Sequence, residues 1–113
     1  KIIKNPEMIY LNSVNPGEIK GPNKHKKRTS YFFCIQGEMI IVILDKNGKY
    51  HEIEVNSRSS KLVSVSNGIS AAIINPSKNI SKILVMADVA WKPNDNEMEN
   101  IIFENYDWKK WKI

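Results

Sequence analysis

Short runs of apolar and β-branched residues, each closed by a turn signal, recur about every ten residues along the chain. No stretch of a dozen residues places apolar side chains at positions i, i+3, i+4 and i+7, which is the spacing of an amphipathic helix. Short strands at this spacing are typical of β-sandwiches and β-barrels. The sequence therefore predicts an all-β fold.

Seven of these runs are predicted to be strands. Met39–Leu44 is apolar throughout, which indicates a strand buried on both faces. Asn47-Gly48 follows it, and this pair favours a tight β-hairpin turn because both residues adopt positive φ easily. Asn15-Pro16-Gly17 indicates another turn after the first run. The predicted strands are Met8–Leu11, Tyr31–Ile35, Met39–Leu44, Tyr50–Val55, Leu62–Val65, Ala71–Ile74 and Ile83–Val89.

The length of 113 residues limits the chain to one hydrophobic core. A chain of this size buries roughly 65% of the surface that its unfolded form exposes, which excludes a cofactor domain beside a separate substrate domain. We expect one domain over residues 1–113, with a barrel core at about residues 8–90 and a C-terminal tail at 91–113. The aromatic side chains of the tail are expected to cover one end of the core, and docking of a partner protein is the alternative.

Two further classes are disfavoured by the apolar runs and by the cysteine content. The longest uninterrupted apolar run has six residues, against the ~20 that span a bilayer, so no membrane segment is expected. The single cysteine, Cys34, cannot form an internal disulfide and cannot alone make a structural zinc site. Cys34 is expected to be a small buried apolar residue, and a cytoplasmic location is predicted.

The net charge of +5 is concentrated in the first third of the chain. Residues 1–37 carry seven basic and two acidic side chains, whereas residues 38–113 carry ten of each. This concentration suits a phosphate-binding patch, and a Lys-rich composition without a specific partner is the alternative. Only two of the 17 basic residues are Arg, so nucleic-acid binding is not expected. Five of the basic residues fall within nine positions: Lys20, Lys24, Lys26, Lys27 and Arg28.

Two segments match the spacing of the paired metal-binding motifs of cupins, which are small jelly-roll β-barrels. Asn23-Lys24-His25 stands where the first cupin motif has His-x-His, Ser30 stands at its Glu, and Ala71 stands at the His of the second motif. Only one of the four usual ligands is therefore present, and metal sites normally need three or more protein ligands. The resemblance implies a single-domain cupin barrel, or double-stranded β-helix. No metal ion and no other cofactor is expected.

A narrower resemblance extends from Met8 to Trp108. The matching segments are similar to the core of dTDP-4-dehydrorhamnose 3,5-epimerases and their relatives, which act on nucleotide-linked 4-keto sugars. The resemblance implies a small-molecule nucleotide sugar as ligand, a place in polysaccharide or cell-surface glycan synthesis, and a homodimer. The N-terminal arm of such epimerases, which adds strands to the sheet and to the dimer, has no counterpart among these residues. The matching segments are Tyr10–Gly21, His25–Thr29, Val42–Asp45, Pro93–Glu97 and Asn105–Trp108.

The resemblance also shows where the chemistry of the family has changed. Epimerisation beside a carbonyl needs a base that removes a carbon-bound proton and an acid on the opposite face that returns one. The residues at the matching positions are Asn23 and Trp91, and neither an amide nor an indole can serve as base or acid near neutral pH. His25 shares a strand face with Asn23 and could restore the base, a purely structural His25 being the alternative. The other histidine, His51, is expected to be exposed.

Cations near the barrel mouth would bind the diphosphate of a nucleotide sugar. In an unbroken strand Lys20, Lys26 and Arg28 would share one face and Lys27 would lie on the other. Tyr31 could stack on the base or the sugar, with core packing as the alternative. The predicted substrate-binding residues are Lys20, Asn23, His25, Lys26, Arg28 and Tyr31.

Three functions remain open after these observations. The loss of the family base and acid favours a sugar-nucleotide-binding protein with weak or no epimerase activity. The second function is a metal-independent epimerase or isomerase with His25 as its base. The third is a structural protein whose sheet edge or aromatic tail docks another protein. Neither a nucleic acid nor a membrane is expected as a partner.

Overall fold

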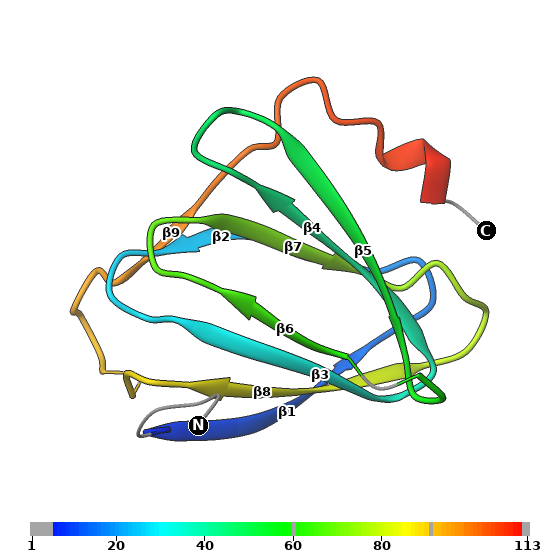
Figure 1. The fold of residues 1–113 in the computed structure, drawn as a ribbon, viewed down its shortest axis with the longest axis horizontal. Helices are drawn as coiled ribbons and strands as arrows, with labels where there is room; N and C mark the ends of the chain where they lie inside the picture. The colour runs from blue at the N-terminus through cyan, green and yellow to red at the C-terminus, as the bar shows by residue number, and fades with distance from the viewer. Residues whose placement is uncertain (1–5, 60, 91, 112–113) are drawn as a thin grey trace.

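A computed structural model of the chain describes residues 6–59, 61–90 and 92–111, and these residues form nine β-strands and one short 3-10 helix (Figure 1). The elements are β1 Met8–Val14, β2 Ile19–His25, β3 Ser30–Gln36, β4 Glu38–Leu44, β5 Tyr50–Asn56, β6 Leu62–Val65, β7 Ser70–Ile74, β8 Ser81–Ala87, β9 Met98–Asn100 and the helix η1 Trp108–Trp111. No helix in this part of the chain is long and apolar enough to cross a membrane.

The strands form two antiparallel sheets that pack face to face (Figure 1). One sheet has the order β1-β8-β3-β6 and the other has the order β5-β4-β7-β2-β9. Buried side chains from both sheets, among them Val14, Ile41, Val63 and Ile83, fill the space between them. The predicted all-β jelly-roll fold is confirmed.

Several strands begin or end at other residues than predicted, because pairing with neighbouring strands determines their length. The first strand continues past Leu11 to Val14 because β8 pairs with it along its whole length. The strand predicted to end at Val89 ends at Ala87, where its pairing with β1 and β3 stops. The sequence pattern did not indicate β2, because Gly21 and Pro22 are typical of turns. Pairing of β2 with both β7 and β9 holds this segment extended despite its composition.

The apolar strand β4 is buried on both faces, as predicted. Met39 and Ile41 point into the core between the sheets, whereas Ile40 and Val42 belong to a second buried cluster on the outer face of the five-stranded sheet. Phe103 from the C-terminal tail completes that outer cluster. A continuous apolar run is needed here because water is excluded from both sides of the strand.

The C-terminal tail covers the outer face of β4 and β5, where Figure 1 shows it in orange and red. Its aromatic residues thus cover a buried cluster of the chain's own core, as expected, but on the outer face of the sheet and not at one end of the core. Phe103 and Trp108 stack with ring centroids 5.9 Å apart, and the Tyr50 hydroxyl donates a 2.6 Å hydrogen bond to the Glu104 carbonyl. The Tyr106 hydroxyl donates to Glu52, and burial together with this carboxylate raises the pKa of Tyr106 to about 12.

Truncation of one tail residue tests whether the tail is part of the folded unit. Phe103→Ala should lower the free energy of unfolding by about 3 kcal/mol, because Phe103 is 5% exposed and its removal leaves a cavity against β4. The neighbouring variant Ile102→Ala is the control, since Ile102 is 84% exposed and its loss should change stability by less than about 0.5 kcal/mol. Equal effects of the two variants in urea denaturation would contradict this description of the tail.

Candidate functional site

Two adjoining cavities lie where the end of β2 meets the loop before β3. The first, of about 120 Å³, lies between the sheets. The second, of about 110 Å³, adds Asp95 and Glu97 and shares His25, Arg28 and Met98 with the first. Side chains that line the first cavity include Tyr10 and Asn12 from β1, Phe32 from β3, and Lys20, Asn23 and His25 from β2.

Four of the six predicted substrate-binding residues line the first cavity: Lys20, Asn23, His25 and Arg28. Asn23 and His25 share one side of β2, as strand alternation predicts. Lys20 is an odd number of residues away from Asn23, yet it lines the same cavity. A break in the register of β2 against β7 between Lys20 and Asn23 accounts for this placement.

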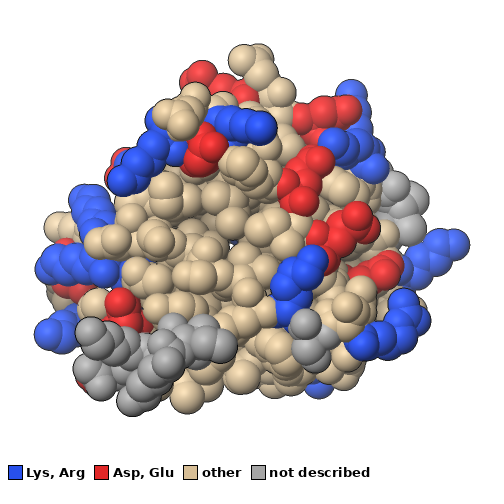
Figure 2. All heavy atoms as spheres, in the orientation of Figure 1, with Lys and Arg blue, Asp and Glu red and all other residues tan. Residues whose placement is uncertain are grey.

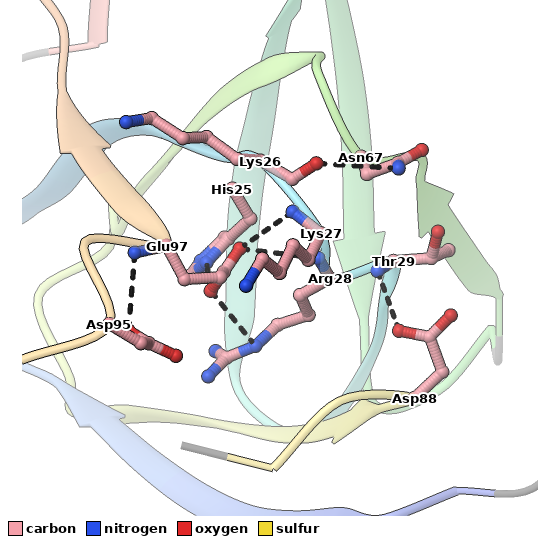
Figure 3. A network of polar contacts seen from close by, with 9 residues as sticks. All are labelled: His25, Lys26, Lys27, Arg28, Thr29, Asn67, Asp88, Asp95 and Glu97. Carbon is pink, nitrogen blue, oxygen red and sulfur yellow. Dashed lines mark hydrogen bonds and ion pairs between the residues drawn. The ribbon is translucent and has the colours of Figure 1, made fainter. Parts of the chain in front are cut away.

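The structure places the other two predicted residues, Lys26 and Tyr31, outside both cavities. The expectation that Lys20, Lys26 and Arg28 share the face of one strand is wrong, because β2 ends at His25 and β3 begins only at Ser30. Figure 3 shows the Lys26 side chain extending away from Glu97. In β3 it is Phe32 that faces the core, so the adjacent Tyr31 lies on the opposite face of the strand.

A buried carboxylate holds His25 at the boundary of the two cavities (Figure 3). Glu97 is only 6% exposed, and its Oε1 atom lies 2.7 Å from Nδ1 of His25. The other carboxylate oxygen, Oε2, accepts hydrogen bonds of 3.2 Å from the backbone N–H groups of Lys27 and Arg28. Glu97 therefore joins the segment before β9 to the end of β2 and to the following loop.

The charge state of Glu97 determines which nitrogen of His25 carries the proton. Burial alone would raise the pKa of Glu97, but hydrogen bonds from His25 and from two backbone N–H groups outweigh it, so the pKa lies below its ordinary value of 4.5. An ionised carboxylate only accepts hydrogen bonds, so Nδ1 of His25 must be the donor. In a neutral imidazole this leaves Nε2 unprotonated, and Nε2 makes no hydrogen bond to a described residue.

Backbone contacts fix the loop that carries Arg28. The Lys26 N–H donates a 2.7 Å hydrogen bond to the Glu97 carbonyl, and the Thr29 N–H donates one of 2.8 Å to Asp88. The Gly68 N–H also donates to the His25 carbonyl at 2.8 Å. These contacts come from three separate parts of the chain, so the position of the loop depends on the complete fold.

The remaining predicted positions lie away from the cavities or outside the described residues. Trp91, the expected counterpart of the family acid, is one of the residues that the structure does not describe.

Cys34 is buried as predicted, and burial raises the pKa of its thiol. His51 is exposed as predicted and lies 2.7 Å from Asp45, whose pKa it lowers. Among residues 6–59, 61–90 and 92–111, no three His, Cys, Asp or Glu side chains gather closely enough to hold a metal ion.

Basic and acidic side chains are interspersed over the face shown in Figure 2, with an uncharged area near its middle. The basic side chains visible on this face therefore do not form one continuous patch. Two basic residues of the first third, Lys20 and Arg28, reach the first cavity.

Sequence reasoning did not single out Glu97 or Tyr10 as site residues. Glu97 is 72 positions from His25, and only the folded chain brings the two together. The resemblance in Pro93–Glu97 pointed to the segment but not to this residue. Extending the first predicted strand to the apolar Val14 would have indicated that Tyr10 faces inward. The two residues are four positions apart, so their side chains lie on the same face of β1.

One family model, described as "FdtA: WxcM-like, C-terminal", matches residues 2–107 of the chain. None of the curated proteins matches significantly. Among solved structures, a dTDP sugar isomerase from Desulfovibrio desulfuricans G20 is similar, with a TM-score of 0.86 at 15% identity. That match covers 96% of this chain and 74% of the isomerase chain.

Two other solved structures have the same fold over a smaller share of their length. The capsular polysaccharide assembling protein CapF from Staphylococcus aureus has a TM-score of 0.81 at 18% identity, with 88% of this chain and 28% of CapF covered. ChmJ, a 3'-monoepimerase from Streptomyces bikiniensis in complex with dTDP-quinovose, has a TM-score of 0.77 at 10% identity, with 85% of this chain and 52% of ChmJ covered. The present chain thus spans about a quarter of CapF and about half of ChmJ.

The buried position of Glu97 generates a prediction about acid stability. Because the pKa of Glu97 is lowered by folding, its ionised form stabilises the protein above about pH 4.5, and this stabilisation is lost as the pH falls through the folded-state pKa. Glu97→Gln should therefore lower the free energy of unfolding by about 1–3 kcal/mol at pH 7, and this loss should shrink at pH 3.

Urea denaturation at both pH values measures the difference. Glu99→Gln is the matched control, because Glu99 is exposed and lies 3.9 Å from Lys24. The control should change stability by less than about 0.5 kcal/mol at either pH. A loss for Glu97→Gln that is equal at pH 7 and pH 3 would contradict the ionised, buried carboxylate.

Proposed function

The chain belongs to the family described as "FdtA: WxcM-like, C-terminal", and from this premise we propose that it is a metal-independent isomerase or epimerase of a nucleotide-linked keto sugar. His25 is the group that moves the proton. The observation that carries the proposal is the 2.7 Å contact between Nδ1 of His25 and the buried carboxylate of Glu97, beside a cavity between the sheets. A histidine whose Nδ1 is held by a carboxylate presents Nε2 as a possible base.

The substrate class is supported by the resemblance of the sequence motifs and by the proteins that share the fold. One such structure is described as a dTDP sugar isomerase, and another is a 3'-monoepimerase solved with dTDP-quinovose. For the present chain we propose the same class, a nucleoside diphosphate linked to a sugar that carries a ketone. A place in polysaccharide biosynthesis follows from the same likeness, since CapF is described as a capsular polysaccharide assembling protein.

The proposed step begins when unprotonated Nε2 of His25 takes a proton from the carbon beside the sugar carbonyl. The C–H bond breaks, its electron pair forms a carbon–carbon double bond, and the carbonyl oxygen takes up the negative charge. Return of a proton to the opposite face of the same carbon gives an epimer. Return of the proton to the former carbonyl carbon gives an isomer with a moved carbonyl. In that case the hydroxyl of the carbon that was first deprotonated loses its proton and becomes the new carbonyl, and the former carbonyl oxygen takes up a proton to become a hydroxyl. Both outcomes balance without an oxidant or a reductant.

Glu97 acts on this step through His25. It accepts the Nδ1–H hydrogen bond, fixes the tautomer with a free Nε2, and stabilises the imidazolium that forms when Nε2 takes the proton. Tyr10 lines the same cavity from β1, which belongs to the opposite sheet. Its hydroxyl can donate a proton, so Tyr10 is our candidate for the acid on the opposite face of the sugar.

Asn23 favours a second candidate function, a sugar-nucleotide-binding protein without catalysis. Asn23 stands at the position of the family base, lines the cavity and has no titratable group. A binding protein of this kind would need the cavity and its polar side chains but no proton transfer. The homodimer implied by the family resemblance and the cytoplasmic location predicted from the cysteine content are retained as proposals for either function.

Solvent deuterium exchange tests the proposed reaction. Incubated in deuterium oxide with dTDP-, UDP- or GDP-linked 4-keto sugars, the protein should place deuterium on a carbon next to the carbonyl, as measured by mass spectrometry and NMR. His25→Ala should reduce the exchange rate by about 10²–10⁴-fold, because the general base is lost. His51→Ala is the control, because His51 is exposed and lies on β5, which is not next to β2 in the sheet. This variant should catalyse exchange at the wild-type rate.

The outcomes separate the two candidate functions. Exchange that persists in His25→Ala contradicts the assignment of the base. Calorimetric binding of a sugar nucleotide without exchange supports the binding protein instead. Neither binding nor exchange at millimolar concentration of any of these sugars contradicts both candidates.

A further inference from the structure

The outer face of the four-stranded sheet carries two rows of mostly apolar side chains. Strand alternation directs these side chains away from the core, and none of them belongs to either buried cluster. Each row crosses all four strands through directly paired residues. The first row is Leu11, Leu84, Phe33 and Leu62, and the second row is Ile9, Met86, Tyr31 and Ser64.

This face is exposed although its composition is typical of a buried surface. Ile9 is 59% exposed, Leu11 is 50% exposed, and Ile35 at the end of β3 is 45% exposed. On the other sheet the outer face of β4 is also apolar, but there the C-terminal tail covers it (Figure 1). Within the described ranges, no tail or loop joins the two rows into a buried cluster. A contiguous apolar patch of this kind marks a contact site for another protein chain.

The size of the face suits the centre of a protein–protein contact. Neighbouring strands lie about 4.8 Å apart and rise about 3.4 Å per residue, so the two rows together with Ile35 extend over roughly 300 Å². A stable interface of standard size buries about 800 Å² on each partner. The rows therefore supply the apolar centre of such an interface, and the two ends of the sheet must supply its polar rim.

Opposite charges stand at these two ends. Lys82 is the only charged residue of β1, β3, β6 and β8, and it lies beyond the first row, paired with Ser13. Glu7 lies beyond the second row, at the other end of the sheet, where its N–H donates a hydrogen bond to the Ala87 carbonyl. A chain with a net charge of +5 repels its own copies least through a face that is almost uncharged.

We propose that this face binds a second copy of the chain, outer face against outer face. A two-fold axis that lies between the two copies and runs across the strands would place the first row of each copy on the second row of the other. The same axis pairs Lys82 with the partner's Glu7 twice, because an isologous contact repeats every interaction. Sheets packed in this way lie about 10 Å apart, with their strands rotated by about 30°.

The proposed contact is separate from the candidate site. The first cavity lies between the two sheets of one chain, so a copy bound to the outer face leaves the cavity open. The two features share only β1, which presents Ile9 and Leu11 outward and Tyr10 and Asn12 to the cavity. The family resemblance implied a homodimer to which an N-terminal arm contributes, whereas this contact consists only of the four strands and Glu7.

The mass of the protein in solution tests the contact directly. Analytical ultracentrifugation at micromolar to millimolar concentration should show a species of twice the 13.0 kDa of one chain. Leu11→Lys should raise the dimer dissociation constant by about 100-fold or more, because each copy then buries an unpaired charge at the centre of the contact. Ile102→Lys is the matched control, since it adds the same charge at an 84% exposed apolar residue of the tail. The control should dimerise like the wild type.

A charge exchange tests the direction of the two-fold axis. Lys82→Glu and Glu7→Lys should each weaken the dimer by about three- to tenfold, because each places like charges opposite one another at both ends of the contact. The double variant should regain the wild-type dissociation constant, since the pairs are restored with their signs exchanged. A double variant that binds no more tightly than the single variants overturns this direction of the axis.

The outcomes are independent of the proposed reaction. A dimer that is lost in Leu11→Lys and kept in Ile102→Lys supports the contact even if no keto sugar exchanges deuterium. Wild-type protein that remains a monomer at millimolar concentration overturns the contact even if exchange is observed, and leaves the face to a different protein. A dimer that persists in Leu11→Lys also overturns it. Ile9→Lys, in the second row, keeps the test decisive if circular dichroism shows that Leu11→Lys does not fold.

Discussion

Burial of β4 on both faces is the constraint from which the path of the chain follows. The inner face packs against the opposite sheet, but the outward side chains Ile40 and Val42 need a second cover, which the tail supplies with Phe103. After β8 the chain lies in the other sheet, so it reaches this outer face by way of β9, at the free edge of β2. The segment leading into β9 carries Glu97 and so brings it against His25. The geometry of the site is thus a consequence of how the sheet is covered.

One carboxylate organises the charge at the end of β2. Glu97 is tolerated in a buried position because a histidine and two backbone N–H groups satisfy its oxygens. The same contacts fix the tautomer of His25 and hold the loop that presents Arg28. His25 and Arg28 therefore lie side by side at the cavities, and the buried Nε of Arg28 makes no hydrogen bond to a described residue.

The sequence predicted most of the strands and part of the site, and the exceptions have physical causes. Gly21 and Pro22 favour a turn locally, yet pairing on both edges keeps β2 extended. Lys26 and Tyr31 were expected at the ligand. Lys26 instead follows the end of β2, and the side chain of Tyr31 lies on the outer face of β3. Local pattern predicts which side chains alternate within a strand. It does not predict where a strand ends when the partner that holds it comes from a distant segment.

The resemblance of the sequence motifs to cupins implied the jelly-roll barrel and the family. Apolar runs, strand alternation and turn signals determined by themselves the all-β class and most of the strands. These features depend on short-range sterics and on the two-residue period of a strand, which any local segment displays. Tertiary structure alone decided the partner of His25, the burial of Arg28, and the use of the tail as a cover for β4. Each of these joins residues that are far apart in the chain, and the free energy that fixes them comes from burial and charge pairing in the completed fold.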